Sequence, residues 1–195
     1  MKYFIRYYKW HLIFFALVLA CVIFLFANML SVVEPDLVVS YVGSQYINTQ
    51  KFNDTKKQIE TLLKDTNQDN KKSAAIYAHA GDTQKELDEL LEEVLDDKES
   101  DIFIATRETF ENCKDKSMFA DVSSYLVYDP EKIDVVTDDD GRAFAVSLKG
   151  NEFVENFGII DPTELYIAAA SSGEDEMTDR EKNGRNITGD IINRD

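Results

Sequence analysis

The stretch "DLVVSYV" (Asp36–Val42) consists of apolar and β-branched residues, with polar side chains only at its start and at Ser40. Such a run is typical of a strand that is covered on both faces of a sheet. Gly43 and Ser44 end the run. In the segment Thr49–Lys64 that follows, four apolar residues recur on one helical face: Phe52, Ile59, Leu62 and Leu63. The sequence therefore predicts a buried strand followed by an amphipathic helix.

The same alternation continues along the chain. The runs "AAIYA" (Ala74–Ala78) and "DIFIAT" (Asp101–Thr106) are predicted strands. Between them, "GDTQKELDELLEEVLDD" is the clearest helix, because Thr83 and Glu86 have the spacing of a capping box and leucines follow at helical intervals. Strand, helix, strand, helix, strand predicts an α/β fold: one three-layer lobe with a mainly parallel sheet and right-handed crossovers.

The acidic run in "DVVTDDDGRAFAVSL" (Asp134–Leu148) is either the turn of a hairpin or a metal site. Asp140-Gly141 between two β-prone runs is a strong hairpin signal, since these residues tolerate a positive φ. A calcium ion takes six to eight oxygen ligands, and adjacent aspartates point in different directions. We predict a β-hairpin and no metal.

The N-terminal part contains an apolar run without charge, Leu12–Leu30, which is 19 residues long. As a helix it would reach about 28 Å, close to the thickness of a bilayer core. Lys2, Arg6 and Lys9 precede it and no acidic residue does, which favours a cytoplasmic N-terminus. We predict a basic and aromatic flank over 1–11, a transmembrane helix over 12–33, an extracellular domain over 34–170 and a polar tail over 171–195. The predicted location is the cell membrane, with the bilayer as first partner.

Two other interpretations of this N-terminal segment stay open. A cleaved signal peptide has an apolar core of about 7–15 residues and a small-x-small cleavage site, and "FANMLSVV" offers no good match. A lipoprotein signal would place the lipid on Cys21, but nine mostly apolar residues follow Cys21 where a polar linker is usual. Length and flanks favour an uncleaved helix, and a mass measurement tests it.

Charge and cysteines narrow the function classes. Without Lys2, Arg6 and Lys9 the chain has 18 Lys and Arg against 37 Asp and Glu, a net charge of −19. That charge disfavours nucleic acid as a partner. Cys21 lies in the predicted span and Cys113 in the domain, so no internal disulfide is expected, and Cys113 is predicted to be a structural thiol.

Ligands of parallel sheets bind beyond the carboxyl ends of the strands. The candidate ligand-binding residues at those ends are Ser44, Tyr46, His79, Thr106 and Arg107. His79 is the only histidine outside the membrane region, and no zinc site or nucleophile–base pair can be assembled from one histidine and one cysteine. The sequence predicts no catalytic residue, no metal and no cofactor.

The segment "DTNQDNKKSAAI" (Asp65–Ile76) imitates the start of a calcium loop. Asp65, Asn67 and Asp69 occupy positions 1, 3 and 5 of that pattern. Asn70 replaces the glycine of position 6, and Ile76 replaces the glutamate of position 12. A solvated loop is favoured, and weak cation binding stays open until calcium is titrated.

Four segments occur in the same order as in a known family: "PDLVVSYVG", "DIFIATRETFEN", "FADVSSYL" and "DGRAFAVSL". Together they resemble the first lobe of bacterial extracellular solute-binding proteins of the type II periplasmic-binding fold, over Pro35–Leu148. The start "YYKWHLIFF" resembles small membrane-tethered proteins of Gram-positive bacteria such as clostridia. In the solute-binding family the hairpin leads to a second lobe, which needs on the order of a hundred residues. Here 47 residues follow Leu148.

The expected function is therefore that of a non-enzymatic, single-pass membrane protein that displays one α/β domain outside the cell. The domain is expected to act as an interaction or accessory module with a membrane or surface protein as partner. The alternative is a solute-binding component of a transport system, in which a partner supplies the second wall. A surface hydrolase is a remote third reading, because no nucleophile–base pair is visible.

Overall fold

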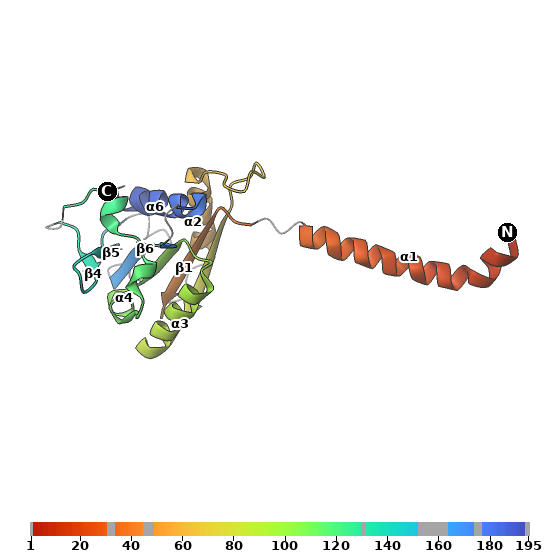
Figure 1. The fold of residues 1–195 in the computed structure, drawn as a ribbon, viewed down its shortest axis with the longest axis horizontal. Helices are drawn as coiled ribbons and strands as arrows, with labels where there is room; N and C mark the ends of the chain where they lie inside the picture. The colour runs from red at the N-terminus through yellow and green to blue at the C-terminus, as the bar shows by residue number, and fades with distance from the viewer. Residues whose placement is uncertain are drawn as a thin grey trace. The chain divides into compact units, whose positions relative to one another are not determined.

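The chain forms two compact units, Met1–Glu34 and Pro35–Asp195. The computed structural model describes residues 2–30, 34–44, 49–129, 132–151, 164–173 and 177–193. The first unit holds one helix, α1 (Lys2–Leu30), and the second unit is an α/β domain (Figure 1). The predicted α/β class of the domain is confirmed.

The domain is built on a six-stranded sheet with the order β2-β1-β3-β6-β5-β4. Its strands are β1 (Leu37–Gly43), β2 (Ala74–Ala80), β3 (Ile102–Thr106), β4 (Val135–Thr137), β5 (Ala143–Ser147) and β6 (Leu165–Ala169). The pairings of β1 with β2 and with β3 are parallel, whereas β6, β5 and β4 are added antiparallel. The sheet is thus mixed rather than mainly parallel. The hairpin explains part of this, because a tight turn can join only antiparallel strands.

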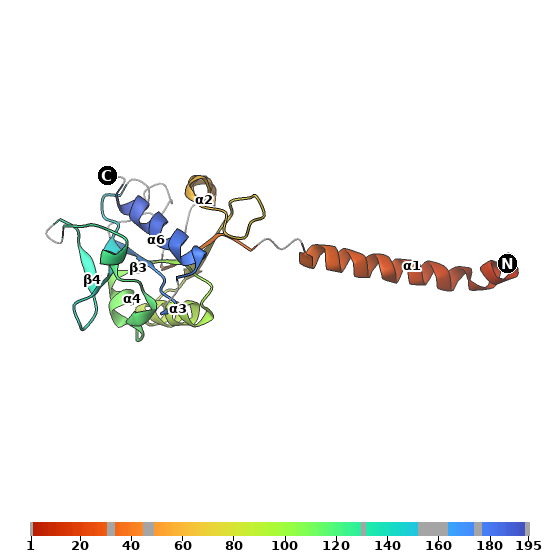
Figure 2. The ribbon, with the colours of Figure 1, turned by 45° about the horizontal axis from the view of Figure 1, so that its top comes forward.

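Helices cover both faces of the sheet (Figures 1 and 2). Helices α2 (Thr49–Leu62) and α6 (Asp179–Ile192) pack on one face, where Ile59 and Ile187 join one buried cluster. Helices α3 (Gln84–Asp97) and α4 (Arg107–Asn112) pack on the other, where Leu91 and Phe110 join the second cluster. The three-layer arrangement is therefore confirmed.

The order of the first three strands explains why α2 and α3 lie on opposite faces. The chain moves from β1 to β2 in one direction and then crosses back over β1 to β3. Two right-handed crossovers that run in opposite directions must place their helices on opposite faces. The predicted capping box of α3 is present, with the Thr83 side chain accepting from the backbone N–H of Glu86.

The cluster beneath α3 and α4 is rich in phenylalanine. Phe119, which follows the short 3-10 helix η1 (Lys116–Met118), stacks on Phe144 with ring centroids 5.3 Å apart. Phe103 and Phe110 meet Phe119 edge-on at 5.5 and 5.4 Å. A second 3-10 helix, η2 (Val122–Ser124), packs Val122 into the opposite cluster. These contacts link the parallel half of the sheet to the antiparallel half.

The acidic run forms a hairpin turn, as predicted. Asp138 N–H donates to the carbonyl of Arg142 at 3.0 Å, and Gly141 adopts a φ of +81°. The Asp138 carboxylate accepts from the Arg142 backbone N–H at 2.9 Å and from Arg142 Nε at 2.8 Å. Asp138 is therefore engaged within the turn and holds Arg142 in place.

The predicted polar tail over 171–195 is wrong for Asp179–Ile192, which form α6. Thr178 and Glu181 start this helix with a second capping box. Ile187 and Ile191 are buried against the sheet, so the helix belongs to the domain core. It was missed because few apolar residues stand among many polar ones, and because Gly184 and Gly189 weaken the helical signal.

Helix α1 forms over the segment for which a membrane span was predicted. Its described side chains from Ile13 to Phe24 are all exposed. Counted over the residues that the structure describes, no helix offers an apolar stretch long enough to cross a bilayer. The predicted transmembrane helix over 12–33 is therefore not supported, and positions 31–33 of it lie outside the described residues.

Candidate functional site

The carboxyl ends of β1, β2 and β3 form one edge of the sheet. The antiparallel register of β3 with β6 places Thr106 opposite Leu165, so β6 begins at this edge. The pairing of Ser147 with Tyr166 brings the end of β5 there as well. The direction of the winding reverses between β1 and β3, which is where open α/β sheets bind ligands.

The predicted site residues are not all brought together at this edge. Ser44 is exposed at the end of β1, and Tyr46 lies outside the described residues. His79 pairs with Val42 one residue before the end of β2, and its side chain is partly exposed. Thr106 and Arg107 lie together where β3 becomes α4.

Thr106 has a structural task at this corner. It is the N-cap of α4, and its hydroxyl accepts from the backbone N–H of Thr109 at 3.3 Å. The two threonine hydroxyls share a hydrogen bond of 2.8 Å, and Gln84 donates to Thr109 Oγ1 at 2.9 Å. The Thr106 hydroxyl thus starts the helix and links it to the first turn of α3.

Arg107 is the centre of an ion cluster. Its Nε donates to Glu111 at 2.7 Å, and its Nη1 lies 3.0 and 3.1 Å from the two carboxylate oxygens of Asp134. The same Nη1 donates to the Tyr166 hydroxyl at 3.2 Å, and that hydroxyl donates to Asp134 at 2.5 Å. The guanidinium also lies over the Tyr166 ring, 5.6 Å from its centroid. One side chain therefore connects β3, the start of β4 and the start of β6.

The charges of the Arg107 cluster interact mainly with one another. Hydrogen bonds from Tyr166 and Arg107 hold the pKa of Asp134 below its usual value, although burial acts against them. Burial and the neighbouring Asp134 raise the pKa of Tyr166. Hydrogen bonds to Glu111 and then Asp134 raise the pKa of Arg107, so its charge is permanent. Two carboxylates already surround this cation, which weakens it as a site for an anionic solute.

The sequence predicts Arg107 at this edge but not the three side chains that bind it. Glu111 stands four residues after Arg107 on α4, a spacing that does predict an ion pair. Asp134 and Tyr166 lie 27 and 59 residues away, and no local pattern links them to Arg107. Only the strand order brings these partners to one edge.

Cys113 follows α4 and is buried. Burial, together with the charge of Glu92, raises the pKa of its thiol to about 11. The thiol is therefore protonated at neutral pH, which does not suit a nucleophile. Within the described parts of the chain, no group of three or more His, Cys, Asp or Glu side chains is placed to hold a metal ion.

The second feature of interest is the open edge of the sheet at β2. This strand pairs with β1 on one side, and the described residues place no strand on its other side. Its sequence, "AAIYAHA", contains no Lys, Arg, Asp, Glu or Pro, and Tyr77 is 50 % exposed. Protein edges are usually protected by charge, proline or a bulge, and an unprotected edge can pair with another strand.

The hydrogen-bonding groups along this edge can be assigned from the alternation of the strand. Ala74 N–H donates to the Glu60 side chain at 3.3 Å, so the backbone groups of Ala74 point away from β1. Because backbone groups alternate along a strand, those of Ile76 and Ala78 point the same way. They form the part of the edge that an added strand would meet.

Comparison of the chain with protein-family models, with curated proteins and with solved structures finds no match. The resemblance to solute-binding proteins therefore stays a prediction that rests on the order of four short segments.

Proposed function

We propose that this chain is a membrane-attached interaction module, in which the α/β domain adds an extended segment of another protein to the open edge of β2. The observation that carries this proposal is the seven-residue edge strand without charge or proline. Strand addition draws affinity from main-chain hydrogen bonds and specificity from pockets for alternate side chains. The domain is strongly acidic, so the partner segment is basic and extended.

Attachment to the bilayer is supported by the N-terminal sequence. The exposed apolar side chains Ile13–Phe24 belong to a longer uncharged run, Leu12–Leu30, in the printed sequence. Basic residues at positions 2, 6 and 9 favour a cytoplasmic N-terminus and therefore an extracellular domain. A partner on the cell surface or in the same membrane follows from that placement.

The solute-binding alternative has weaker support. It needs free polar groups at the carboxyl edge, and the donors of Arg107 are already bound to Glu111, Asp134 and Tyr166. The hydroxyl of Thr106 is likewise engaged at the start of α4. An interaction module that binds along β2 needs no free polar groups at the carboxyl edge. We therefore favour a non-enzymatic interaction module over a solute-binding component.

Peptide selection on the full chain in detergent micelles tests strand addition. Basic peptides selected from a random library are expected to lose binding to Ala78→Pro, because proline removes an outward N–H at the edge. Ser44→Pro, at the exposed end of β1, is the matched control and should bind as the wild type does. Equal binding to wild type and Ala78→Pro would contradict the proposal. Stabilisation by free amino acids or sugars without peptide binding would favour the solute-binding reading.

Vesicle flotation tests membrane attachment separately. The full chain is expected to float with phosphatidylcholine vesicles after urea and high-salt washes. Leu17→Asp combined with Phe24→Asp should reduce flotation, because a carboxylate is costly to transfer from water into hydrocarbon. Complete removal of the wild-type chain by the washes would contradict attachment through α1. Protease digestion of intact cells then reports on which side the domain lies.

A further inference from the structure

We propose that the loop between α2 and β2 is a binding site for Ca²⁺, independent of the β2 edge and of the proposed partner. Its side-chain ligands stand at alternate positions of the chain: Asp65, Asn67, Asp69 and Ser73. The backbone carbonyl of Lys71 completes this alternation. From the sequence alone the segment was expected to be a solvated loop. The atomic contacts of the loop favour the ion instead.

Three side-chain oxygens of this loop are shielded from solvent and accept no hydrogen bond: Asp65 Oδ1, Asp69 Oδ2 and Ser73 Oγ. They make up half of the six unpartnered buried side-chain atoms found among the described residues, yet they lie within nine positions of one another. A shielded carboxylate oxygen without a partner costs free energy, and each such atom calls for a physical explanation. A cation bound by all three oxygens satisfies them together.

The remaining oxygens of the same side chains shape the loop. Asp65 Oδ2 accepts from the backbone N–H of Asn70 at 2.9 Å, and Asp69 Oδ1 accepts from that of Lys71 at 2.8 Å. Asn67 Oδ1 accepts from the N–H of Asp69 at 3.0 Å. Each aspartate therefore uses one oxygen to fold the backbone and keeps the other for the ion.

The backbone of the loop makes the turn of a calcium loop although the usual glycine is absent. Calcium loops of this spacing need a sharp turn at position 6, where glycine is usual. Asn70 stands at that position and adopts a φ of +63°, and Gln68, two residues earlier, adopts +60°. Asparagine is, after glycine, among the residues that most readily adopt this left-handed conformation. The turn is therefore made without glycine.

Asp36, immediately before β1, is hydrogen-bonded to both ends of this loop. Its carboxylate is fully buried and accepts from the Thr66 backbone N–H at 2.6 Å, the Thr66 hydroxyl at 2.8 Å and the Ser73 N–H at 3.0 Å. The N–H of Asn67 adds a contact of 3.3 Å. Because the two ends of the loop are tied to one buried side chain, little ordering remains for an ion to impose.

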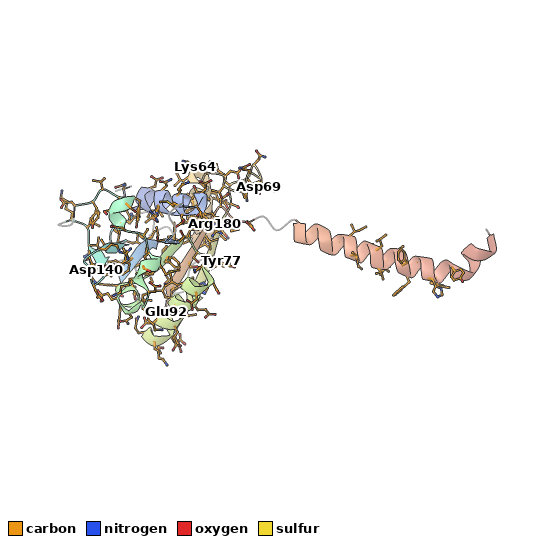
Figure 3. The ribbon with its side chains drawn as sticks, in the orientation of Figure 1. Lys64, Asp69, Tyr77, Glu92, Asp140 and Arg180 are labelled. Carbon is orange, nitrogen blue, oxygen red and sulfur yellow. The ribbon has the colours of Figure 1, made fainter. Side chains whose placement is uncertain are left out.

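The ligand set predicts a weak site that prefers Ca²⁺ to Mg²⁺. It contains two carboxylates, and Ile76 stands where a bidentate glutamate would raise the affinity. Such a site falls in the range of extracellular modules, with a Kd of about 10⁻⁴–10⁻³ M. Mg²⁺ requires near-ideal octahedral geometry and keeps its waters, so a loop of neutral and charged oxygens suits the larger ion better. Asp69 is labelled on this loop in Figure 3.

Calorimetric titration of CaCl2 into the full chain in detergent micelles tests the site, together with the melting temperature at each calcium concentration. The wild type is expected to bind one Ca²⁺ and to melt at a higher temperature as calcium rises into the millimolar range. Asp65→Asn and Asp69→Asn should each weaken binding about tenfold or more, because both lose a charge while retaining an oxygen for the backbone N–H. Ser73→Ala should weaken it less, since the hydroxyl is neutral.

The matched control is Asp96→Asn, an exposed aspartate on α3, which should bind calcium as the wild type does. MgCl2 at equal ionic strength separates specific binding from general screening of an acidic protein. The proposal is overturned if about 10 mM CaCl2 produces neither heat nor a melting shift, given the affinity expected here. It is also overturned if the two loop variants and Asp96→Asn bind equally. The circular dichroism of each variant without calcium shows whether it has folded.

Discussion

Arg180 Nη2 lies 2.9 Å from Asp101 Oδ2, although 79 residues separate the two in the sequence. Arg180 Nε contacts the same oxygen at 3.2 Å, and the backbone N–H of Val38 donates to it at 2.7 Å. Burial outweighs these bonds and raises the pKa of Asp101. This contact fastens α6, near the end of the chain, to β1 and β3 at the edge of the sheet opposite to the Arg107 cluster.

Asp101→Ala is expected to lower the free energy of unfolding by about 1–3 kcal/mol, because it leaves the buried Val38 N–H without an acceptor. Asp179→Ala, which lies on α6 next to Arg180, is the matched control. Asp179 pairs with Lys182 at 2.8 Å, but both side chains are exposed. Losing this ion pair should therefore change the free energy of unfolding by no more than the experimental error. Urea unfolding of the full chain in micelles, followed by circular dichroism, measures both. Equal effects would show that the Asp101–Arg180 contact does not stabilise the domain.

Gly184→Ala is expected to destabilise the domain by about 1–3 kcal/mol through overpacking. A Cβ at this position would lie 2.9 Å from the backbone oxygen of Asp101 and 3.2 Å from its Cβ. Helix α6 therefore has to move away from the sheet, and backbone cannot yield as a flexible side chain can. Asn186→Ala, on the exposed side of α6, should be neutral or slightly stabilising. A stabilised Gly184→Ala would mean that helix propensity outweighs this contact.

Gly141→Ala is expected to cost about 1–2 kcal/mol, since its φ of +81° is disfavoured for a side chain with a Cβ. No atom lies within 4 Å of the added Cβ, so the cost comes from the backbone alone. Gly141→Asn should recover part of the loss, because asparagine tolerates the left-handed region. Thermal melts of both variants test this expectation. Similar losses for alanine and asparagine would point to a different cause, such as a changed hairpin register.

Cys113 is expected to react slowly with maleimide while the domain is folded. Its thiol has a pKa of about 11 because it is buried and lies near Glu92. The thiolate fraction at pH 8 is thus roughly a hundredfold lower than for a free cysteine, and access is restricted as well. In a Cys21→Ser background, labelling should accelerate at least a hundredfold in urea. Fast labelling of the folded chain would identify Cys113 as reactive.

Tyr166→Phe is expected to reduce stability at neutral pH, with a difference from wild type that narrows in acid. The Tyr166 hydroxyl is the largest cause of the lowered pKa of Asp134, ahead of Arg107. A carboxyl whose folded pKa is lowered stabilises the fold above its unfolded pKa of 3.8 and loses that contribution as the pH falls through the lower folded value. Urea unfolding at several pH values between 7 and about 2.5 measures the difference. A difference independent of pH would exclude this linkage.

Much of the fold could be predicted from the sequence. The apolar run at Asp36–Val42 and the capping box at Thr83 define β1 and α3 through interactions between near neighbours. The same holds for the turn at Gly141. The position of Thr106 and Arg107 at the carboxyl edge of the sheet is also predictable, because the ends of parallel strands meet at one edge. Local periodicity and turn preference are properties of a few adjacent residues, so one sequence suffices to show them.

The arrangement of these elements in space depends on contacts between residues that are distant in the sequence. The antiparallel addition of β6 to β3, the docking of α6 through Gly184 and the binding of Arg107 by Asp134 and Tyr166 have no local signature. In the loop at Asp65, too, the sequence shows the residue spacing while the contacts depend on the tertiary structure. Its residue spacing was visible in the sequence, but the unpartnered oxygens and the support from Asp36 appear only when β1 and the loop lie together. Burial and hydrogen bonding depend on what packs nearby, and the tertiary structure alone determines that.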